Sequence, residues 1–129
     1  MAKSVCLNHV AMSVPPGSLT DEFRARINEF YGGLLGWREV DALRLPDRMT
    51  IAIGQGTYIN VRERNDAMQA TGYEHFGVVV STAEELEEVR EAVIARGIVA
   101  SETEAVAGSV LSFRFHHLLP LAVEVQHFG

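Results

Sequence analysis

Two histidines and one glutamate are the residues of this sequence best placed to do chemistry. His9 and His75 each stand third in an apolar, strand-forming run, LNHVAMSV and YEHFGVVV, and about half of the 129-residue chain separates them. Glu124 stands in a further run of this kind, LAVEVQHF. Side chains alternate between the two faces of a strand, so each of the three lies opposite the apolar face of its own strand. A carboxylate in such a place needs an ion pair, a proton or a metal ion.

Two imidazoles and one carboxylate form a recognised ligand set for a divalent metal. Such a set holds zinc with at least one position left for water or substrate, or non-haem iron(II) with open positions for oxygen. Taken singly, each of these residues is more often a hydrogen-bonded member of a sheet. The matching positions of the two histidines in a repeated pattern favour the metal interpretation. If each half of the chain curls into half of an open barrel, these residues lie on its concave face.

The elements that position these residues occur twice along the chain, which indicates an internal duplication. In each half, the strand with the histidine precedes an amphipathic helix and three short strands. The first helix is expected to begin at a cap formed by Ser18 or Thr20 and to end near Gly36. The strands of this half are expected over residues 5–14, 37–45, 48–53 and 57–63.

The second half repeats this order. Its helix is expected to begin at Ser81 or Thr82, each of which stands three residues before a glutamate as in a capping box, and to end near Gly97. The strands are expected over residues 73–80, 98–106, 109–116 and 121–128. We therefore predict an α+β fold. A single domain over residues 1–129 would consist of two βαβββ modules, residues 1–63 and 73–129, joined by a linker over residues 64–72.

Composition narrows the range of partners. The chain carries 17 acidic and 11 basic residues, a net charge of −6, and no cluster of Lys or Arg. Nucleic acid and anionic membranes are therefore poor partners. No segment approaches the roughly 20 apolar residues of a membrane helix or the core of a signal peptide, so we expect a cytoplasmic protein. Cys6, the single cysteine, lies in an apolar run and is expected to be a buried, inert thiol.

The module order and four local features resemble the vicinal oxygen chelate superfamily over essentially the whole chain. The features are LNHVAMSV, the helix end FYGGLLGW, YEHFGVVV and the closing Glu124. This superfamily contains glyoxalase I, methylmalonyl-CoA epimerase, fosfomycin resistance thiol transferases, extradiol dioxygenases and bleomycin resistance proteins. The resemblance implies a U-shaped cleft that holds one divalent ion (Zn, Fe, Mn, Ni or Co) and a small substrate that chelates it through vicinal oxygens.

The resemblance also implies which residues bind the ion. The ligands of the first, fifth and eighth strands correspond to His9, His75 and Glu124, and the fourth-strand position falls on Asn60. Glyoxalase I enzymes generally have Glu or Gln at that position, so a three-ligand site like that of the fosfomycin enzymes and dioxygenases fits this sequence better. Further residues are expected in the substrate cleft: Tyr58, Arg62, Arg114 and Gln126.

The resemblance leaves more than one function open. The first is a metal-dependent enzyme, with lyase or isomerase, thiol transferase and dioxygenase chemistry all open. The second is a metal-free protein of the bleomycin resistance kind that sequesters a ligand, and the third is a dimer whose histidines and glutamate only pair with one another. Leu118 and Leu119 replace the Asp-Gly turn common in the superfamily and are expected to be buried, against a partner chain or over the cleft. With the resemblance, they indicate a homodimer that can share metal sites between chains.

Overall fold

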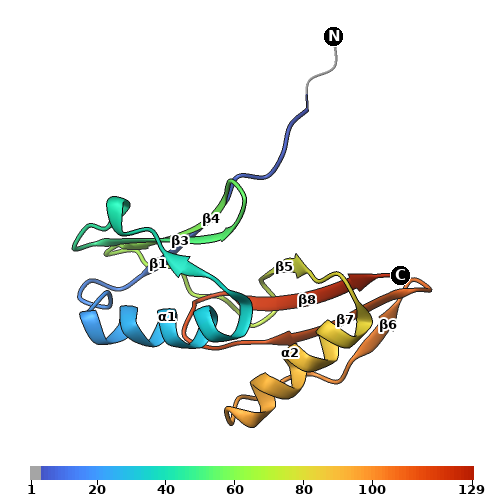
Figure 1. Ribbon diagram of the computed structural model, residues 1–129. Helices are drawn as coiled ribbons and strands as arrows, with labels where there is room; N and C mark the ends of the chain where they lie inside the picture. Colours follow the sequence, from blue (N-terminus) through green and yellow to red (C-terminus); the bar gives the residue numbers. More distant parts are fainter. Residues whose placement is uncertain (1–3) are drawn as a thin grey trace. The chain divides into compact units, whose positions relative to one another are not determined.

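A computed structural model describes residues 4–129 and divides them into two compact units. The first unit extends to Met68, and the second is Gln69–Gly129. Each unit contains one α-helix and one four-stranded sheet (Figure 1), and, a short 3-10 helix in the first unit apart, the element order in each is one strand, one helix and three strands. The α+β class and the two βαβββ modules are therefore confirmed. The predicted first module includes residues 1–3, which lie outside the described residues.

In the first unit, helix α1 lies along one face of the sheet (Figure 1). The strand order is β1-β4-β3-β2, with β1 parallel to β4 and the other pairs antiparallel. The elements are β1 His9–Val14, α1 Asp21–Leu35, β2 Arg38–Glu39, the 3-10 helix η1 Asp41–Leu43, β3 Arg48–Gly54 and β4 Thr57–Glu63.

The second unit has the same topology. The strand order is β5-β8-β7-β6, and again only the first and last strands, β5 and β8, run parallel to each other. The elements are β5 His75–Val79, α2 Ala83–Ala95, β6 Glu104–Val106, β7 Val110–Phe115 and β8 Ala122–Phe128. Among residues 4–129, neither helix has the length and apolar character needed to cross a membrane.

The two helix termini predicted with caps are confirmed. The Thr20 side chain accepts a hydrogen bond from the Phe23 N–H at 3.1 Å, and Thr82 does the same for the Glu85 N–H at 3.0 Å. These bonds satisfy N–H groups that have no partner within the helix. Gly36 ends α1 in the left-handed conformation, with φ of 73°.

The FYGGLLGW motif builds the end of α1. The Trp37 N–H donates to the Tyr31 carbonyl at 3.3 Å, and the two rings stack with their centroids 5.0 Å apart. A side chain at Gly32 would have its Cβ 3.2 Å from the Trp37 carbonyl oxygen, so this position is restricted to glycine unless the chain shifts. Burial raises the pKa of the Tyr31 phenol. The motif most typical of the superfamily therefore has a structural role here.

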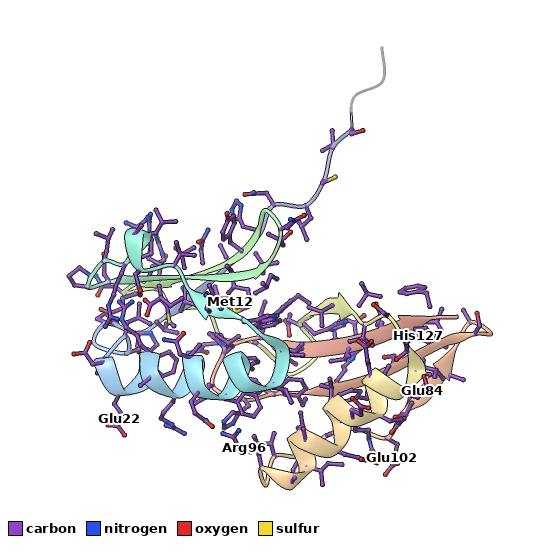
Figure 2. The ribbon with its side chains drawn as sticks, in the orientation of Figure 1. Met12, Glu22, Glu84, Arg96, Glu102 and His127 are labelled. Atoms are coloured by element: carbon purple, nitrogen blue, oxygen red, sulfur yellow. The ribbon has the colours of Figure 1, made fainter. Side chains whose placement is uncertain are left out.

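Apolar side chains fill the space between each sheet and its helix. In the first unit, Met12 lies in this core and is 3% exposed (Figure 2), whereas Glu22 projects from α1 away from the sheet. The second unit buries Leu86 and Val93 of α2. Its strands contribute Phe113, Phe115, Val123 and Val125.

Three of the predicted strands lose four or more residues in the structure. The expected strand over residues 37–45 is a strand only at β2, because Leu43 N–H and Arg44 N–H donate to carbonyls of the local 3-10 turn instead of to a neighbouring strand. Only residues 104–106 of the strand expected over 98–106 form an element. Residues 4–8 precede β1 and are exposed, so the prediction that Cys6 is a buried thiol is wrong.

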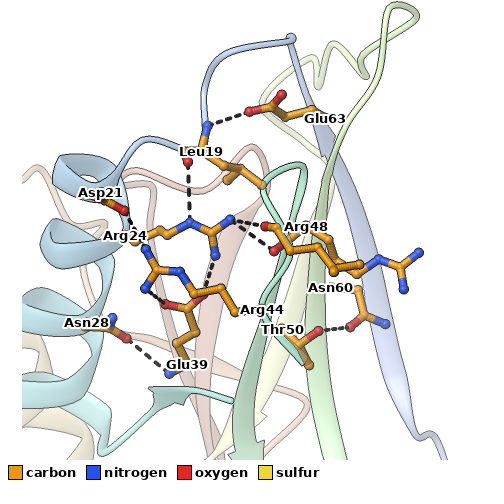
Figure 3. Close-up of polar contacts among 11 residues, drawn as sticks. Leu19, Asp21, Arg24, Asn28, Glu39, Arg44, Arg48, Thr50, Asn60 and Glu63 are labelled. Carbon is orange, nitrogen blue, oxygen red and sulfur yellow. Dashed lines mark hydrogen bonds and ion pairs between the residues drawn. The ribbon is translucent and has the colours of Figure 1, made fainter. Parts of the chain in front are cut away.

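A buried arginine attaches the segment before β3 to helix α1 (Figure 3). Arg24 is 2% exposed and forms an ion pair with Glu39. One of its terminal nitrogens also donates to the carbonyl oxygens of Leu45, at 2.5 Å, and Arg48, at 3.1 Å. Arg44 reaches the same Glu39 carboxylate at 3.4 Å. The segment over residues 41–47 is therefore held by a guanidinium group whose three nitrogen atoms all donate hydrogen bonds.

Replacement of Arg24 by methionine should destabilise the protein by about 3 kcal/mol, because it leaves Glu39 buried beside only the more distant Arg44. Urea unfolding would measure the loss. The matched control is Arg26→Met, which removes an exposed charge from the same helix. Equal stability of the two variants would contradict the structural role given to Arg24.

The carboxylate of Glu63 makes folding stability depend on pH. Its Oε2 accepts a hydrogen bond from the Leu19 N–H at 2.9 Å (Figure 3), and backbone hydrogen bonds from Gly17 and Leu19 lower the pKa of this carboxyl. Because the pKa of Glu63 is lower in the folded state than in the unfolded state, the ionised carboxylate stabilises the fold when the pH is above the ordinary pKa of a glutamate. That contribution disappears as the pH falls through the lowered value.

The variant Glu63→Gln should therefore be less stable than the wild type near neutral pH, and the difference should shrink below about pH 4. Urea unfolding at a series of pH values measures this convergence. Glu91→Gln, at an exposed site on α2, is the control. A stability difference for Glu63→Gln that stays constant down to acid pH would show that the hydrogen bonds do not depend on the charge.

Candidate metal centre

The second unit brings two of the predicted ligands together. In the parallel pairing of β5 with β8, His75 lies opposite Ala122 and Gly77 lies opposite Glu124, so His75 and Glu124 are diagonal neighbours on one face. The Nε2 atom of His75 is 3.2 Å from Oε2 of Glu124. Val123 and Val125 are fully buried on the opposite face, toward α2. The prediction that Glu124 is a carboxylate within an apolar strand is thus confirmed, and it is 9% exposed.

A hydrogen bond determines which nitrogen of His75 is available. Its Nδ1 lies 2.6 Å from the carbonyl oxygen of Tyr73. A carbonyl can only accept a hydrogen bond, so Nδ1 carries the proton and Nε2 of the neutral ring has a free electron pair. Metal-binding histidines are commonly held in this way, with the second ring nitrogen donating to a carbonyl or a carboxylate.

The donor set fits a cation. In the neutral ring, the electron pairs of His75 Nε2 and Glu124 Oε2 face each other, so the contact is favourable only with a proton or a metal ion between them. Two ligand atoms that each bind one ion at about 2.1 Å lie about 3.0 Å apart at a right angle and about 3.4 Å apart at a tetrahedral angle. The observed separation of 3.2 Å falls within this interval.

The rest of the Glu124 carboxylate is held by two neighbours. Arg114 Nε donates to Oε2 at 2.9 Å, and Gln126 Nε2 donates to Oε1 at 2.8 Å. The Arg114 guanidinium also lies over the Tyr73 ring, 5.7 Å from its centroid. Arg114 and Gln126, expected in the substrate cleft, therefore orient Glu124. A hollow of about 300 Å³ is lined by Ser101, Glu104, Val106, Ser112, Arg114 and Glu124.

The first unit orients His9 in a comparable way. Its Nδ1 lies 3.0 Å from Oδ1 of Asn8, while Asn8 Nδ2 donates to the Gly56 carbonyl at 3.0 Å. Because the amide nitrogen is committed to Gly56, the atom facing His9 is an acceptor and Nδ1 carries the proton. His9 therefore also presents an unprotonated Nε2 when the ring is neutral.

The two units differ at one equivalent position. Asn60 has the same register relative to His9 in β1 and β4 as Glu124 has relative to His75 in β5 and β8. Opposite Asn60 stands Thr50, whose hydroxyl donates to Asn60 Oδ1 at 3.2 Å, in the place where Arg114 stands opposite Glu124. A neutral pair in the first unit thus replaces a charged pair in the second.

A pocket of about 390 Å³ opens on this face of the first sheet, and we call it the first-unit pocket. It is lined by Asn8, His9, Ala42, Leu43, Leu45, Arg48, Thr50, Tyr58 and Asn60. Tyr58, predicted in the cleft, lines it, whereas Arg62 borders a separate hollow with Asp47 and Asp66. Sequence reasoning missed Arg48, although its alternation with Thr50 places it on the same face.

One residue of the turn before β8, Leu119, is buried without a second chain. Leu119 is 1% exposed in the single chain, and Leu118 adopts a positive φ of 65°. His116 Nε2 lies 2.6 Å from the Leu119 carbonyl oxygen. The expectation that the leucines are buried is correct for Leu119, but this burial no longer supports the homodimer. Among residues 4–129, neither unit by itself groups three His, Cys, Asp or Glu side chains in an arrangement suited to a metal ion.

Nitrogen-15 NMR of the imidazole rings tests this hydrogen bonding. At a pH where the rings are neutral and metal is absent, His9 and His75 should carry their protons on Nδ1. His116, whose Nε2 faces a carbonyl, should carry its proton on Nε2 and serves as the internal control. An Nε2-protonated His75 would mean that the nitrogen facing Glu124 is not available as a ligand.

Solved structures of other proteins have a fold similar to that of this chain. No family model and no curated protein matches the sequence. A candidate glyoxalase family protein from Bacillus anthracis is similar in structure over 100% of both chains, with a TM-score of 0.74 and 17% identity. The fosfomycin resistance protein FosX from Listeria monocytogenes has a TM-score of 0.68 and 18% identity, over 100% of this chain and 96% of that one.

A mutant of FosX was solved with Mn(II) and 1S,2S-dihydroxypropylphosphonic acid. Its TM-score is 0.67 at 17% identity, and the similarity covers 100% of this chain and 95% of that one. Glyoxalase family and fosfomycin resistance proteins both belong to the vicinal oxygen chelate superfamily. The chain described here has the glyoxalase-like fold of that superfamily.

Proposed function

We propose that this protein is a divalent-metal-dependent enzyme acting on a small molecule whose oxygen atoms bind the ion. The ligands are His75 and Glu124, with His9 as the third. The observation that carries the proposal is the 3.2 Å approach of His75 Nε2 to Glu124 Oε2, two electron-pair donors on one sheet face. The superfamily fold and the Mn(II) complex of a FosX mutant support it.

The surrounding residues keep the ligands in a binding geometry. The Tyr73 carbonyl holds the proton of His75 on Nδ1, which directs the electron pair of Nε2 toward Glu124. Gln126 and Arg114 fix one carboxylate oxygen each, and the Arg114 charge offsets that of Glu124. Oriented ligands of this kind lose little freedom when they bind an ion.

The third ligand is His9, which supplies its unprotonated Nε2 from the same chain or from the second chain of a homodimer. Asn60 is not a fourth ligand in this proposal, because its amide oxygen already accepts a hydrogen bond from the Thr50 hydroxyl. Three protein ligands leave positions open for two oxygen atoms of a substrate.

When bound, the ion acts as a Lewis acid that stabilises negative charge developing on substrate oxygens. Chemistry of this kind serves isomerases, lyases and transferases alike. The names of the similar structures, glyoxalase and fosfomycin resistance protein, favour these classes over a ring-cleaving dioxygenase.

Metal analysis is the direct test. The purified chain should bind about one Mn(II), Zn(II) or Co(II) per protomer, measured by elemental analysis and by calorimetric titration after chelator treatment. His75→Ala, Glu124→Gln and His9→Ala should each weaken binding by at least about 100-fold, because each removes a direct ligand. His127→Gln, near the end of β8, should bind as the wild type does.

Two results would count against the proposal. One is a wild-type protein that takes up none of these ions. The other is a His75→Ala variant with the same affinity as His127→Gln. A metal-free protein that binds a planar cationic drug in one-to-one stoichiometry would instead be a sequestering protein of the bleomycin resistance kind.

A further inference from the structure

The first-unit pocket contains a cation without a counter-ion. Arg48 lines it and is partly buried. Within residues 4–129, the Arg48 guanidinium takes part in no ion pair or hydrogen bond, and no Asp or Glu lines the pocket. In a chain with a net charge of −6, an unpaired arginine in an acid-free pocket is unexpected. Such a pocket favours anions.

The strand register increases the positive charge at this place. Arg48 in β3 lies directly opposite Arg62 in β4, and like charges in this arrangement repel each other. Asp47 borders the hollow next to Arg62, so that charge has an acidic neighbour. Of the two arginines, Arg48 is therefore the one without a nearby negative charge to compensate it.

Neutral hydrogen-bond donors also line the pocket. Because the Asn60 amide oxygen accepts from Thr50, its NH₂ group remains free to donate. Tyr58 adds a phenolic hydroxyl. A guanidinium with a nearby amide and hydroxyl is a suitable set for a carboxylate or phosphonate, whose oxygens accept several hydrogen bonds.

The pocket also has apolar lining residues, which lie on a segment fixed in position. They are Ala42, Leu43 and Leu45, and the two leucines are 51% and 48% exposed. The buried Arg24 holds the carbonyls of Leu45 and Arg48, which attaches this segment and the start of β3 to α1 (Figure 3). The pocket thus combines a cation and hydrogen-bond donors with apolar side chains from an attached segment.

We propose that the first-unit pocket binds a small amphipathic acid. Its anionic oxygens meet Arg48, Asn60 and Tyr58, and its apolar part packs on Leu43 and Leu45. His9 lines the same pocket, so this acid is the substrate of the metal centre. This inference rests on the proposed function only where it identifies the ligand as the substrate.

Calorimetric or NMR titration of the metal-free full chain tests the proposal with four probes. Benzoate and phenylphosphonate should bind one per protomer, and the tighter of the two identifies the preferred acid. Benzamide, which has the same shape as benzoate and no charge, should bind at least about ten-fold more weakly, because it lacks the charge-assisted hydrogen bond. Inorganic phosphate, which lacks the apolar part, should bind more weakly than phenylphosphonate.

Single substitutions test whether the acid binds in the first-unit pocket. Arg48→Gln should weaken binding of the tighter acid by at least about ten-fold, and Arg48→Lys should recover part of the affinity. Leu43→Ser should weaken binding of the same acid, while Arg62→Gln should have a smaller effect than Arg48→Gln. Arg26→Gln, at an exposed site of α1, is the control for charge and should bind as the wild type does.

Equal binding of the acids to wild type and Arg48→Gln would overturn the proposal, as would equal binding of benzoate and benzamide. Failure here is distinct from failure of the metal proposal. If the wild type takes up Mn(II) but acid binding does not depend on Arg48, only the present inference fails. If acid binding depends on Arg48 and no metal ion binds, the proposed acid site is supported and the proposed metal-dependent enzyme is not.

Discussion

The parallel pairing of the first and last strand in each unit determines which side chains can act together. A parallel pair needs a crossover connection, which each unit supplies with its α-helix and the two strands that follow it. In the second unit the register sets His75 diagonally beside Glu124. Because side chains alternate along a strand, a slip of one residue would turn Glu124 toward the helix and its apolar core. The candidate centre therefore depends on backbone hydrogen bonds of the sheet more than on any local motif.

The duplicated units have diverged at the positions this register makes equivalent. The second unit has a carboxylate held by an arginine, whereas the first has an amide held by a hydroxyl. The oxygens of a carboxylate suit a cation, and an amide with free N–H groups suits an anion. Under the two proposals above, the same topology provides one face for an ion and another for an acid. Both histidines keep the same protonated nitrogen, which the different neighbours Asn8 and Tyr73 achieve independently.

Much of the fold could be predicted because its signals are local. Helix caps at Thr20 and Thr82, the glycine that ends α1, and the face carrying Glu124 follow from short patterns. The remaining features depend on distant partners. A helix arginine is normally solvated, and nothing near Arg24 in the sequence reveals that it binds carbonyls more than 20 residues away. The shortened strand after Trp37 has the same cause, since its backbone satisfies that arginine and a local turn.

The attachment by Arg24 affects which residues of the first-unit pocket can be substituted without loss of the fold. The guanidinium holds the segment at residues 41–47 through main-chain oxygens, which every amino acid possesses. Exchange of Leu43 or Leu45 for other residues would alter the lining of the pocket while the anchor stays intact. The lining of the pocket can therefore change at these residues without loss of the scaffold, because side chains line the pocket and main-chain oxygens bind Arg24.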